Sequence, residues 1–544
     1  MAALFLSCLF LKRDEVIFFC ESFTILLEFG LFWTKGETTM ETGGILEEAK
    51  KRSFPLVSYE DWYNKAKPSL INLDSSNNSI PWKALYTETD IGEWADEIRK
   101  NLPAYKGWKI AQLISGKTTE EIRENLLQSI DGGQDTLSFT LLNEWTWKDF
   151  QRLLKGIDLK DYPFFLHSEE KTVPLYLFLN RWANNEGINT KEISGFIGTD
   201  PLAEIALKGN TLEEAEDYYE YWCKGVLFAK NQLPNVKTIY IDGILYELAG
   251  GNSIEQLAYI LLTGVEHLEH LKQNGLSEEE FFNKSVIGIS VTSDFFTEIA
   301  KIRALRYLWG KLVEAYKLPP EKFPVSIYAE TTITNKTTIA LYNNLLRTSG
   351  EALAATIGQV DWLRIRPFDE VVDSGASPLA IRIARNTHHI LREESSIHLV
   401  TDPAGGSYFL ESLTKEMIKK AWALFLQGEE EGGMLESLKK GIVQQKLAAS
   451  SNQKIEAYKN GNQVLLGIHI FPEENFEIGN LRKSEPSTLQ KAKIVNIETL
   501  ERSLEAVPTL FDFTIPVKKL DTSIPTISVD WWKLVVNREG WGEK

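Results

Sequence analysis

The stretch from Tyr328 to Thr414 decides the fold. It begins with a β-rich run followed by a helical run, YAETTITNKTTIALYNNLLRTSGEALAATIG (residues 328–358). Two shorter segments follow, RPFDEVV (366–372) and RIARNTHHILREES (382–395), and TDPAGGSYFLESLT (401–414) closes the stretch. A strand followed by a helix is the unit from which parallel α/β sheets are built.

The same unit repeats toward the N-terminus. Eight such units favour a (β/α)8 TIM barrel, with a doubly wound open sheet as the alternative, so the predicted fold class is α/β. Short strands without strict polar alternation are typical of parallel strands covered by helices. We expect the strands at Trp108–Ile114, Thr136–Leu142, Tyr162–His167, Glu192–Gly198, Lys237–Gly243, Val286–Ser293, Phe323–Glu330 and Trp362–Phe368.

Four of these runs carry a serine near their middle: Ser138, Ser194, Ser290 and Ser326. TIM barrels usually fill their interior with Val, Ile and Leu. If the serines point inward, the barrel axis would be hollow and could hold a long thin ligand. If they face the helices, they carry no such meaning, and the sequence leaves both interpretations open.

Composition and charge argue against several kinds of partner. The 544 residues carry a formal net charge of −17, so we expect neither nucleic acid nor a membrane surface as a partner. The cysteines Cys8, Cys20 and Cys223 form no CxxC pair. This usage suits a reducing compartment, predicts a cytoplasmic location, and gives no sign of a metal site.

Residues 1–39 are rich in Phe and Leu and differ from the rest of the chain. Neither apolar run reaches the roughly 18 uninterrupted apolar residues of a membrane span. Lys12 and Arg13 follow the first apolar run rather than precede it, unlike the charges of a secretory signal. We expect the native chain to start at Met40, with a membrane anchor or signal as the alternative.

The sequence predicts five segments: an apolar leader (1–39), an N-terminal extension (40–105), the barrel (106–414), post-barrel helices with a closing segment (415–475), and a C-terminal tail (476–544). The closing segment contains the strand-like VLLGIHIF (464–471). The tail contains two apolar patches, FDFTIPV (511–517) and VDWWKLVV (529–536). It is too short for a complete nucleotide- or cofactor-binding α/β domain.

From Gly243 to Pro472 the chain resembles the cobalamin-dependent acyl-CoA mutases, methylmalonyl-CoA mutase in particular, and its earlier units resemble them more loosely. The resemblance implies a barrel threaded by an acyl-CoA. It also implies interconversion of succinyl-CoA and methylmalonyl-CoA with adenosylcobalamin, held against a C-terminal domain. The landmarks, in family order, are ELAGGNSIEQLAYILLTGVEHLEHL, DFFTEIAKIRALRYLW, YNNLLRTSGEALAATIG, FDEVV, RIARNTHHILREES, DPAGGSYFLESLT and NQKIEAYKNGNQVLLGIHIF.

The sequence departs from the family pattern where chemistry is expected. The family's cobalt ligand comes from a DxHxxG motif in a flavodoxin-like cobalamin domain. That motif is missing here, because none of the seven histidines has an Asp two residues before it: His167, His267, His270, His388, His389, His398 and His469. We therefore expect no complete cobalamin-binding flavodoxin-like domain.

Family positions that carry catalytic side chains are also changed. A histidine after the fifth strand corresponds to Leu245, and a histidine and a glutamine at the end of the seventh correspond to Ala329 and Thr331. An arginine and a serine near the start of the sixth fall on Lys284 and Val286. Leucine and alanine cannot donate a hydrogen bond to a thioester carbonyl. The resemblance thus implies no catalytic residue on this chain.

Three carboxylates remain as candidate cofactor-binding residues. Glu247, Asp369 and Glu370 occupy positions that face the corrin ring in catalytic members of the family. The alternative is that they are ordinary carboxylates at helix starts, where the helix dipole favours negative charge. For the adjacent His388 and His389 we expect surface or packing roles.

The family includes heterodimers of a catalytic large subunit and a catalytically silent small one. The resemblance therefore implies that this chain is such a small subunit, within an isomerase whose large subunit binds adenosylcobalamin, and that it holds no cofactor itself. Acyl-CoA remains a candidate ligand. The alternatives are an active mutase barrel served by a separate cobalamin domain, and a non-enzymatic acyl-CoA-binding barrel.

Overall fold

The computed structural model describes residues 10–12, 15–17, 58–67, 80–83, 85–103, 105–142, 145–209, 212–372, 375–472 and 525–536. The chain divides into two compact units, Met1–Asn72 and Leu73–Lys544. In the first unit β1 (Phe10–Lys12) pairs antiparallel with β2 (Glu15–Ile17). Helix α2 (Tyr59–Ala66) begins at Ser58, whose hydroxyl accepts a hydrogen bond from the Asp61 amide.

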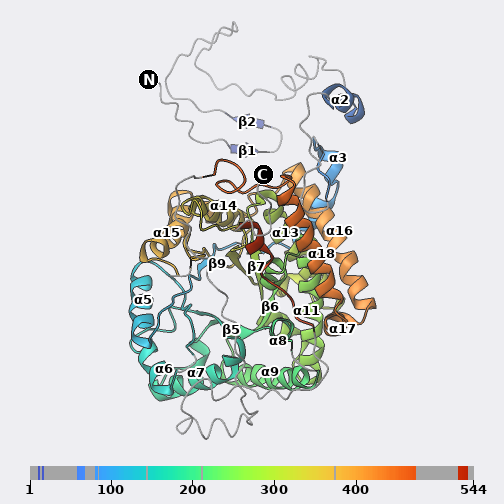
Figure 1. Ribbon diagram of the computed structural model, residues 1–544. Helices are drawn as coiled ribbons and strands as arrows, with labels where there is room; N and C mark the ends of the chain where they lie inside the picture. Colours follow the sequence, from blue (N-terminus) through green and yellow to red (C-terminus); the bar gives the residue numbers. More distant parts are fainter. Residues whose placement is uncertain are drawn as a thin grey trace. The chain divides into compact units, whose positions relative to one another are not determined.

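The second unit is built around a curled parallel sheet of seven strands, in the order β3-β9-β8-β7-β6-β5-β4 (Figure 1). The predicted α/β class is confirmed. The strands are β3 (Lys109–Ile110), β4 (Phe164–His167), β5 (Gly195–Thr199), β6 (Val236–Asp242), β7 (Ser285–Val291), β8 (Ile327–Thr331) and β9 (Trp362–Arg364).

Residues 136–140 link the two edges of this sheet. Leu137 bridges Phe164 in β4, and Phe139 bridges Ile114, just beyond β3. The backbone amides of Leu137 and Ile114 donate to the carbonyls of Pro163 and Ser138, both at 2.9 Å. These links complete an eight-membered, TIM-like barrel, as the eight units predicted.

The second predicted strand, Thr136–Leu142, is reduced to these bridges because side chains replace part of its backbone ladder. Asp135 accepts from the Ile110 amide at 2.6 Å, and Thr136 donates to the Ile110 carbonyl at 2.5 Å. The Gln134 side chain donates to the Gln112 carbonyl at 3.0 Å. Side-chain groups thus satisfy backbone groups that a regular strand would pair.

Helices follow the strands and cover the outside of the barrel (Figure 1). Helix α5 starts where Thr118 accepts from the Glu121 amide. The helices after the strands are α5 (Thr119–Asp131), α6 (Trp147–Leu154), α7 (Thr172–Glu186), α8 (Pro201–Lys208), α9 (Leu212–Gln232), α10 (Gly243–Leu248), α11 (Ser253–Gln273), α12 (Glu278–Lys284), α13 (Phe295–Ala315), α14 (Asn343–Ile357) and α15 (Pro378–His389).

Further helices flank this barrel in sequence. In the described part of this unit, two helices precede β3 and four follow α15, which itself runs into a π-helical turn at Ile390–Glu394. Among the described helices, none combines the length and apolarity that a bilayer crossing requires. The flanking helices are α3 (Glu88–Ile91), α4 (Trp94–Lys100), α16 (Tyr408–Glu430), α17 (Gly433–Lys439), α18 (Ile442–Lys459) and α20 (Trp531–Val536).

The closing segment differs from its prediction. VLLGIHIF was expected to be strand-like, but it folds into a tight turn in which Leu466 and Ile470 form an isolated bridge. Gly467 takes a φ of +83°, which an L-residue rarely adopts and which reverses the chain there. FDFTIPV lies outside the described residues, and VDWWKLVV supplies the short helix α20.

Candidate functional site

Aromatic rings cross the interior of the barrel. Phe165 in β4 stacks on Tyr328 in β8 with ring centroids 4.0 Å apart, and it also contacts Phe196 at 5.1 Å and Trp362 at 5.7 Å. Strands β4 and β8 are separated by three other strands in the sheet. A contact between them therefore has to cross the barrel axis.

This layer favours the second of the two interpretations that the sequence left open, an axis that is not hollow. Ser194 and Ser326 each lie one residue before the start of β5 and β8, and both are only partly buried. The layer also includes Ala111, Tyr240, Ile244 and Val286, all buried.

Side chains alternate along β8, so a position such as Ala329, to which the sequence analysis assigned a catalytic side chain of the family, does not face the barrel interior. Tyr328 belongs to the interior layer, whereas Ala329 packs with the outer core between sheet and helices. Glu330 shares the inward face of Tyr328, and the Tyr328 hydroxyl donates to its carboxylate at 2.5 Å. The interior positions at the end of this strand are thus Tyr328 and Glu330, which the sequence analysis did not single out.

Four charged side chains close the carboxyl end of β8 and β9. Arg364 lies 3.2 Å from Glu330 and 2.8 Å from Glu370, and Arg366 lies 2.7 Å from Glu370 and also pairs with Glu330. Burial raises the pKa of Glu330, but Arg366 and Arg364 outweigh it and hold that pKa at about 2. Two carboxylates and two guanidinium groups thus neutralise one another.

The other two candidate carboxylates are also bound within the chain. Glu247 in α10 is 1% exposed, and it accepts from the hydroxyls of Thr332 at 2.9 Å and Thr334 at 2.7 Å. Asp369 accepts from the amide of Ser377 at 3.2 Å, at the start of α15. As placed, Glu247, Asp369 and Glu370 hold loops and helix starts, and each already has partners for its charge.

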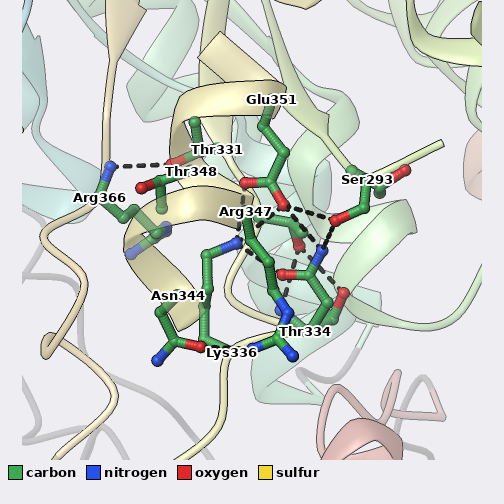
Figure 2. A network of polar contacts seen from close by, with 12 residues as sticks. Ser293, Thr331, Thr334, Lys336, Asn344, Arg347, Thr348, Glu351 and Arg366 are labelled. Atoms are coloured by element: carbon green, nitrogen blue, oxygen red, sulfur yellow. Dashed lines mark hydrogen bonds and ion pairs between the residues drawn. The ribbon is translucent and has the colours of Figure 1, made fainter. Parts of the chain in front are cut away.

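A second buried network lies beside this cluster, between the loop after β8 and α14 (Figure 2). Lys336 donates to both carboxylate oxygens of Glu351, at 2.8 and 2.9 Å, and both residues are almost fully buried. Asn335 donates to Glu351 and to the Ser293 hydroxyl, both at 2.7 Å. Nearby, the Thr331 hydroxyl accepts from the Arg366 amide at 2.8 Å.

Three further positions carry a replacement for a catalytic side chain of the family, and all three are packed or hydrogen-bonded within the chain. Leu245 is 2% exposed and packs in the outer core, and Val286 belongs to the interior layer. Lys284 precedes β7 and donates to the Val236 carbonyl at 2.8 Å, at the opposite end of the barrel from Glu330. None of these three side chains lies in the polar cluster at the carboxyl end.

The histidines do not form a catalytic group within the described chain. His167 ends β4 and contacts the Tyr240 ring at 4.9 Å, near Asp242, whose pKa burial raises to about 6. His267 is buried against Asp200 at 3.1 Å. His388 accepts from the Trp108 indole at 3.0 Å. Across the described residues, no three His, Cys, Asp or Glu side chains gather so as to hold a metal ion.

A parallel barrel with its polar residues at the carboxyl ends of the strands is the architecture on which many enzymes are built. The sequence narrows this class: residues 145–510 match the family model described as methylmalonyl-CoA mutase. The chain belongs to the methylmalonyl-CoA mutase family.

Individual relatives include both kinds of subunit. The chain is 27% identical to a methylmalonyl-CoA mutase small subunit of Porphyromonas gingivalis, over 77% of this chain and 70% of that one. It is 29% identical to the small subunit of Streptomyces virginiae, over 73% and 65%. It is also 28% identical to the large subunit of Propionibacterium freudenreichii subsp. shermanii, over 67% of this chain but half of the relative.

Proposed function

We propose that this chain is the small, non-catalytic subunit of a methylmalonyl-CoA mutase. It pairs with a catalytic large subunit and stabilises it, and the complex interconverts succinyl-CoA and methylmalonyl-CoA. The two small subunits among its relatives support this assignment. We also propose a cytoplasmic location, because the cysteines provide no disulfide framework.

The observation that carries the proposal is the ring layer across the barrel axis. The stacked rings of Phe165 and Tyr328 occupy the path that an acyl-CoA would need in order to thread the barrel. Above them, Glu330 and Glu370 are neutralised by Arg364 and Arg366. These contacts across the axis and the neutralised charges above them support a barrel that serves as a scaffold rather than as an acyl-CoA site.

The cofactor is assigned to the large subunit. The family's adenosylcobalamin supplies a carbon-centred radical when bound. In this chain all three carboxylates expected to face a corrin have partners. Glu247 accepts from Thr332 and Thr334. Asp369 accepts from the Ser377 amide, and Glu370 pairs with the two arginines. These residues do not fit a large planar ligand without breaking those contacts.

Co-expression with a large subunit from the same source organism tests the proposal. We expect a stable one-to-one complex with mutase turnover. The isolated chain should show no turnover and no retained cobalamin spectrum after desalting. Turnover by the isolated chain, or cobalamin binding by it at micromolar affinity, would contradict the assignment as a non-catalytic subunit.

The same preparation separates the two alternatives. Calorimetric titration of the isolated chain with succinyl-CoA should give no binding heat, whereas an acyl-CoA-binding barrel predicts saturable binding without a partner. Addition of a separate cobalamin-binding domain should give no activity, whereas an active substrate subunit predicts turnover.

A further inference from the structure

The C-terminal residues 525–536 return to the barrel and attach to it at two points. Gln444 in α18 donates to the Pro525 carbonyl at 2.7 Å, and the Ile527 amide donates to the Ala206 carbonyl at 2.9 Å. Ile527 is 5% exposed and belongs to the main hydrophobic core. We call residues 525–536 the tail strap.

The strap ends in α20, which begins with two tryptophans. Trp532 is 6% exposed and shares an apolar cluster with Val371, Ile455 and Ile468. The ammonium of Lys454 in α18 lies 5.3 Å from the centre of the Trp531 ring, a cation–π contact. Both indoles are therefore held by the chain itself.

The surface beneath these tryptophans lies at the carboxyl end of the barrel strands. Val371 directly follows Asp369 and Glu370 in the turn after β9. The loop after β8 contributes Ile333 and Ile339 to the same apolar cluster. In TIM barrels this end of the strands carries the ligand-binding face.

Lys454, which contacts the Trp531 ring, also lies near the third predicted carboxylate. Lys454 donates to the Gly251 carbonyl at 3.1 Å, just beyond α10, which carries Glu247. Burial lowers the pKa of Lys454, and the charge of Glu247 opposes that shift. The strap thus rests on side chains close to all three positions that the sequence assigned to a corrin.

We propose that the tail strap is a built-in seal of the barrel's carboxyl-end face, in which Trp531 and Trp532 occupy the surface that a planar cofactor would cover. The inference rests on the proposed function, since a subunit without a cofactor would otherwise expose this apolar surface to water. The occupant is the chain's own residues 525–536, which bring two adjacent indoles to this surface.

Amide hydrogen exchange, read by mass spectrometry, tests the seal in the full-length chain and three variants. One variant ends at Ile524, and one carries Trp531→Ala and Trp532→Ala. The control carries Asp530→Asn, which removes the charge pair with Lys533 at 2.7 Å but keeps both indoles and the contact of Lys533 with the Trp532 ring at 5.9 Å. We expect exchange in residues 332–341, 369–372 and 451–472 to rise by about tenfold or more in the first two variants. Exchange in β7 should not change, and the control should match the full-length chain.

A synthetic peptide of residues 525–536 supplies the second test. Added to the chain that ends at Ile524, it should bind one-to-one and restore protection over the same residues. Unchanged exchange in the folded truncated chain overturns the seal, and so does failure of the peptide to protect it. Global unfolding of both variants also overturns it, because the strap would then be core rather than a cover.

The test of the seal and the test of the subunit assignment can fail separately. Complex formation with a large subunit is measured on the full-length chain, and its failure counts against the proposed function. A seal that fails while the full-length complex forms counts against the strap alone.

Discussion

Lys336 is a lysine held away from water. It is 2% exposed, and its charge is met by Glu351, which is 1% exposed. Burial lowers the pKa of Lys336 and raises that of Glu351, while each charge counteracts the shift of the other. Removing one member of such a pair leaves the other charge buried and unmatched.

We therefore predict that Glu351→Gln destabilises the protein by about 3 kcal/mol or more, read as a lower midpoint of urea unfolding. The matched control is Lys224→Ala, which breaks the exposed pair Glu220–Lys224 at 2.7 Å. Surface pairs contribute little, so its midpoint should stay near that of the unaltered chain. Equal shifts in the two variants would contradict this account.

His388 is held neutral by its neighbours. Its Nδ1 accepts from the Trp108 indole at 3.0 Å, and its Nε2 lies 3.4 Å from the Gln112 side-chain oxygen. Burial, with Arg392 and His389 nearby, lowers its pKa well below the ordinary range. Asp135 faces the same group of side chains and pairs with Arg392 at 3.2 Å.

This arrangement predicts a loss of stability in acid. The unfolded chain takes up a proton at His388 near pH 6.5 and the folded chain does not. The contribution of the neutral His388 to the free energy of unfolding is therefore complete above pH 6.5, and it falls by about 1.4 kcal/mol for each pH unit below that value. Melting temperatures of the unaltered chain and of His388→Gln, compared between pH 7.5 and 5.5, should show a smaller decrease in the variant. Parallel decreases would count against His388 as the source.

At the scale of elements, the ring layer is the feature that joins opposite strands. We predict that Phe165→Ala destabilises the barrel by about 3–5 kcal/mol, because it leaves a cavity where four aromatic rings meet. Phe296→Ala is the control, since Phe296 is 44% exposed. Thermal unfolding followed by circular dichroism measures both, and a large shift in the control alone would be the contrary result.

The elements were largely predictable because their signal is local. Each strand-and-helix unit is formed by consecutive residues, and the cap at Thr118 depends on Thr118 and Glu121 alone. The start of β8 was placed four residues early, at Phe323 instead of Ile327, where Pro324 cannot donate to a ladder. The reduction of the second strand depended on Asp135 and Thr136 reaching another strand, which no local pattern encodes.

The site was predictable only in part, for the same reason. Period-two alternation places Tyr328, Glu330, Arg364 and Arg366 on inward faces, and charged residues in buried strands were a usable signal. The sequence could not show that Phe165 reaches Tyr328 across the axis, since that contact exists only in the closed barrel. Nor could it show that Trp532 lies on the turn that contains Glu370.

At the scale of the whole molecule, closure joins the first strand to the last. The Gln112 side chain donates to the Ile365 carbonyl at 2.8 Å and accepts from the Ile365 amide at 2.7 Å. It thus continues the short pairing of β3 with β9 beyond Leu363. Removal of this amide leaves two buried backbone groups without partners.

We predict that Gln112→Leu lowers the free energy of unfolding by about 3 kcal/mol. Hydrogen exchange should rise in both 109–114 and 362–366, which are far apart in sequence. Gln427→Leu is the control, because Gln427 is exposed and its side chain bonds to Glu431 at 2.8 Å. Faster exchange confined to one of the two segments would show that Gln112 does not close the barrel.

The ring layer also bears on how such a chain tolerates change. An enzyme that passes substrate along its axis has to keep that volume empty, and empty volume in a core costs about 24 cal/mol per Å³. A chain relieved of this demand can fill the volume with Phe165, Tyr328 and Trp362 and keep the stability gained. This additional stability lets surface positions accept more destabilising substitutions before the chain no longer folds. A silent subunit built this way would accumulate substitutions faster than its catalytic partner while it remains a firm support for it.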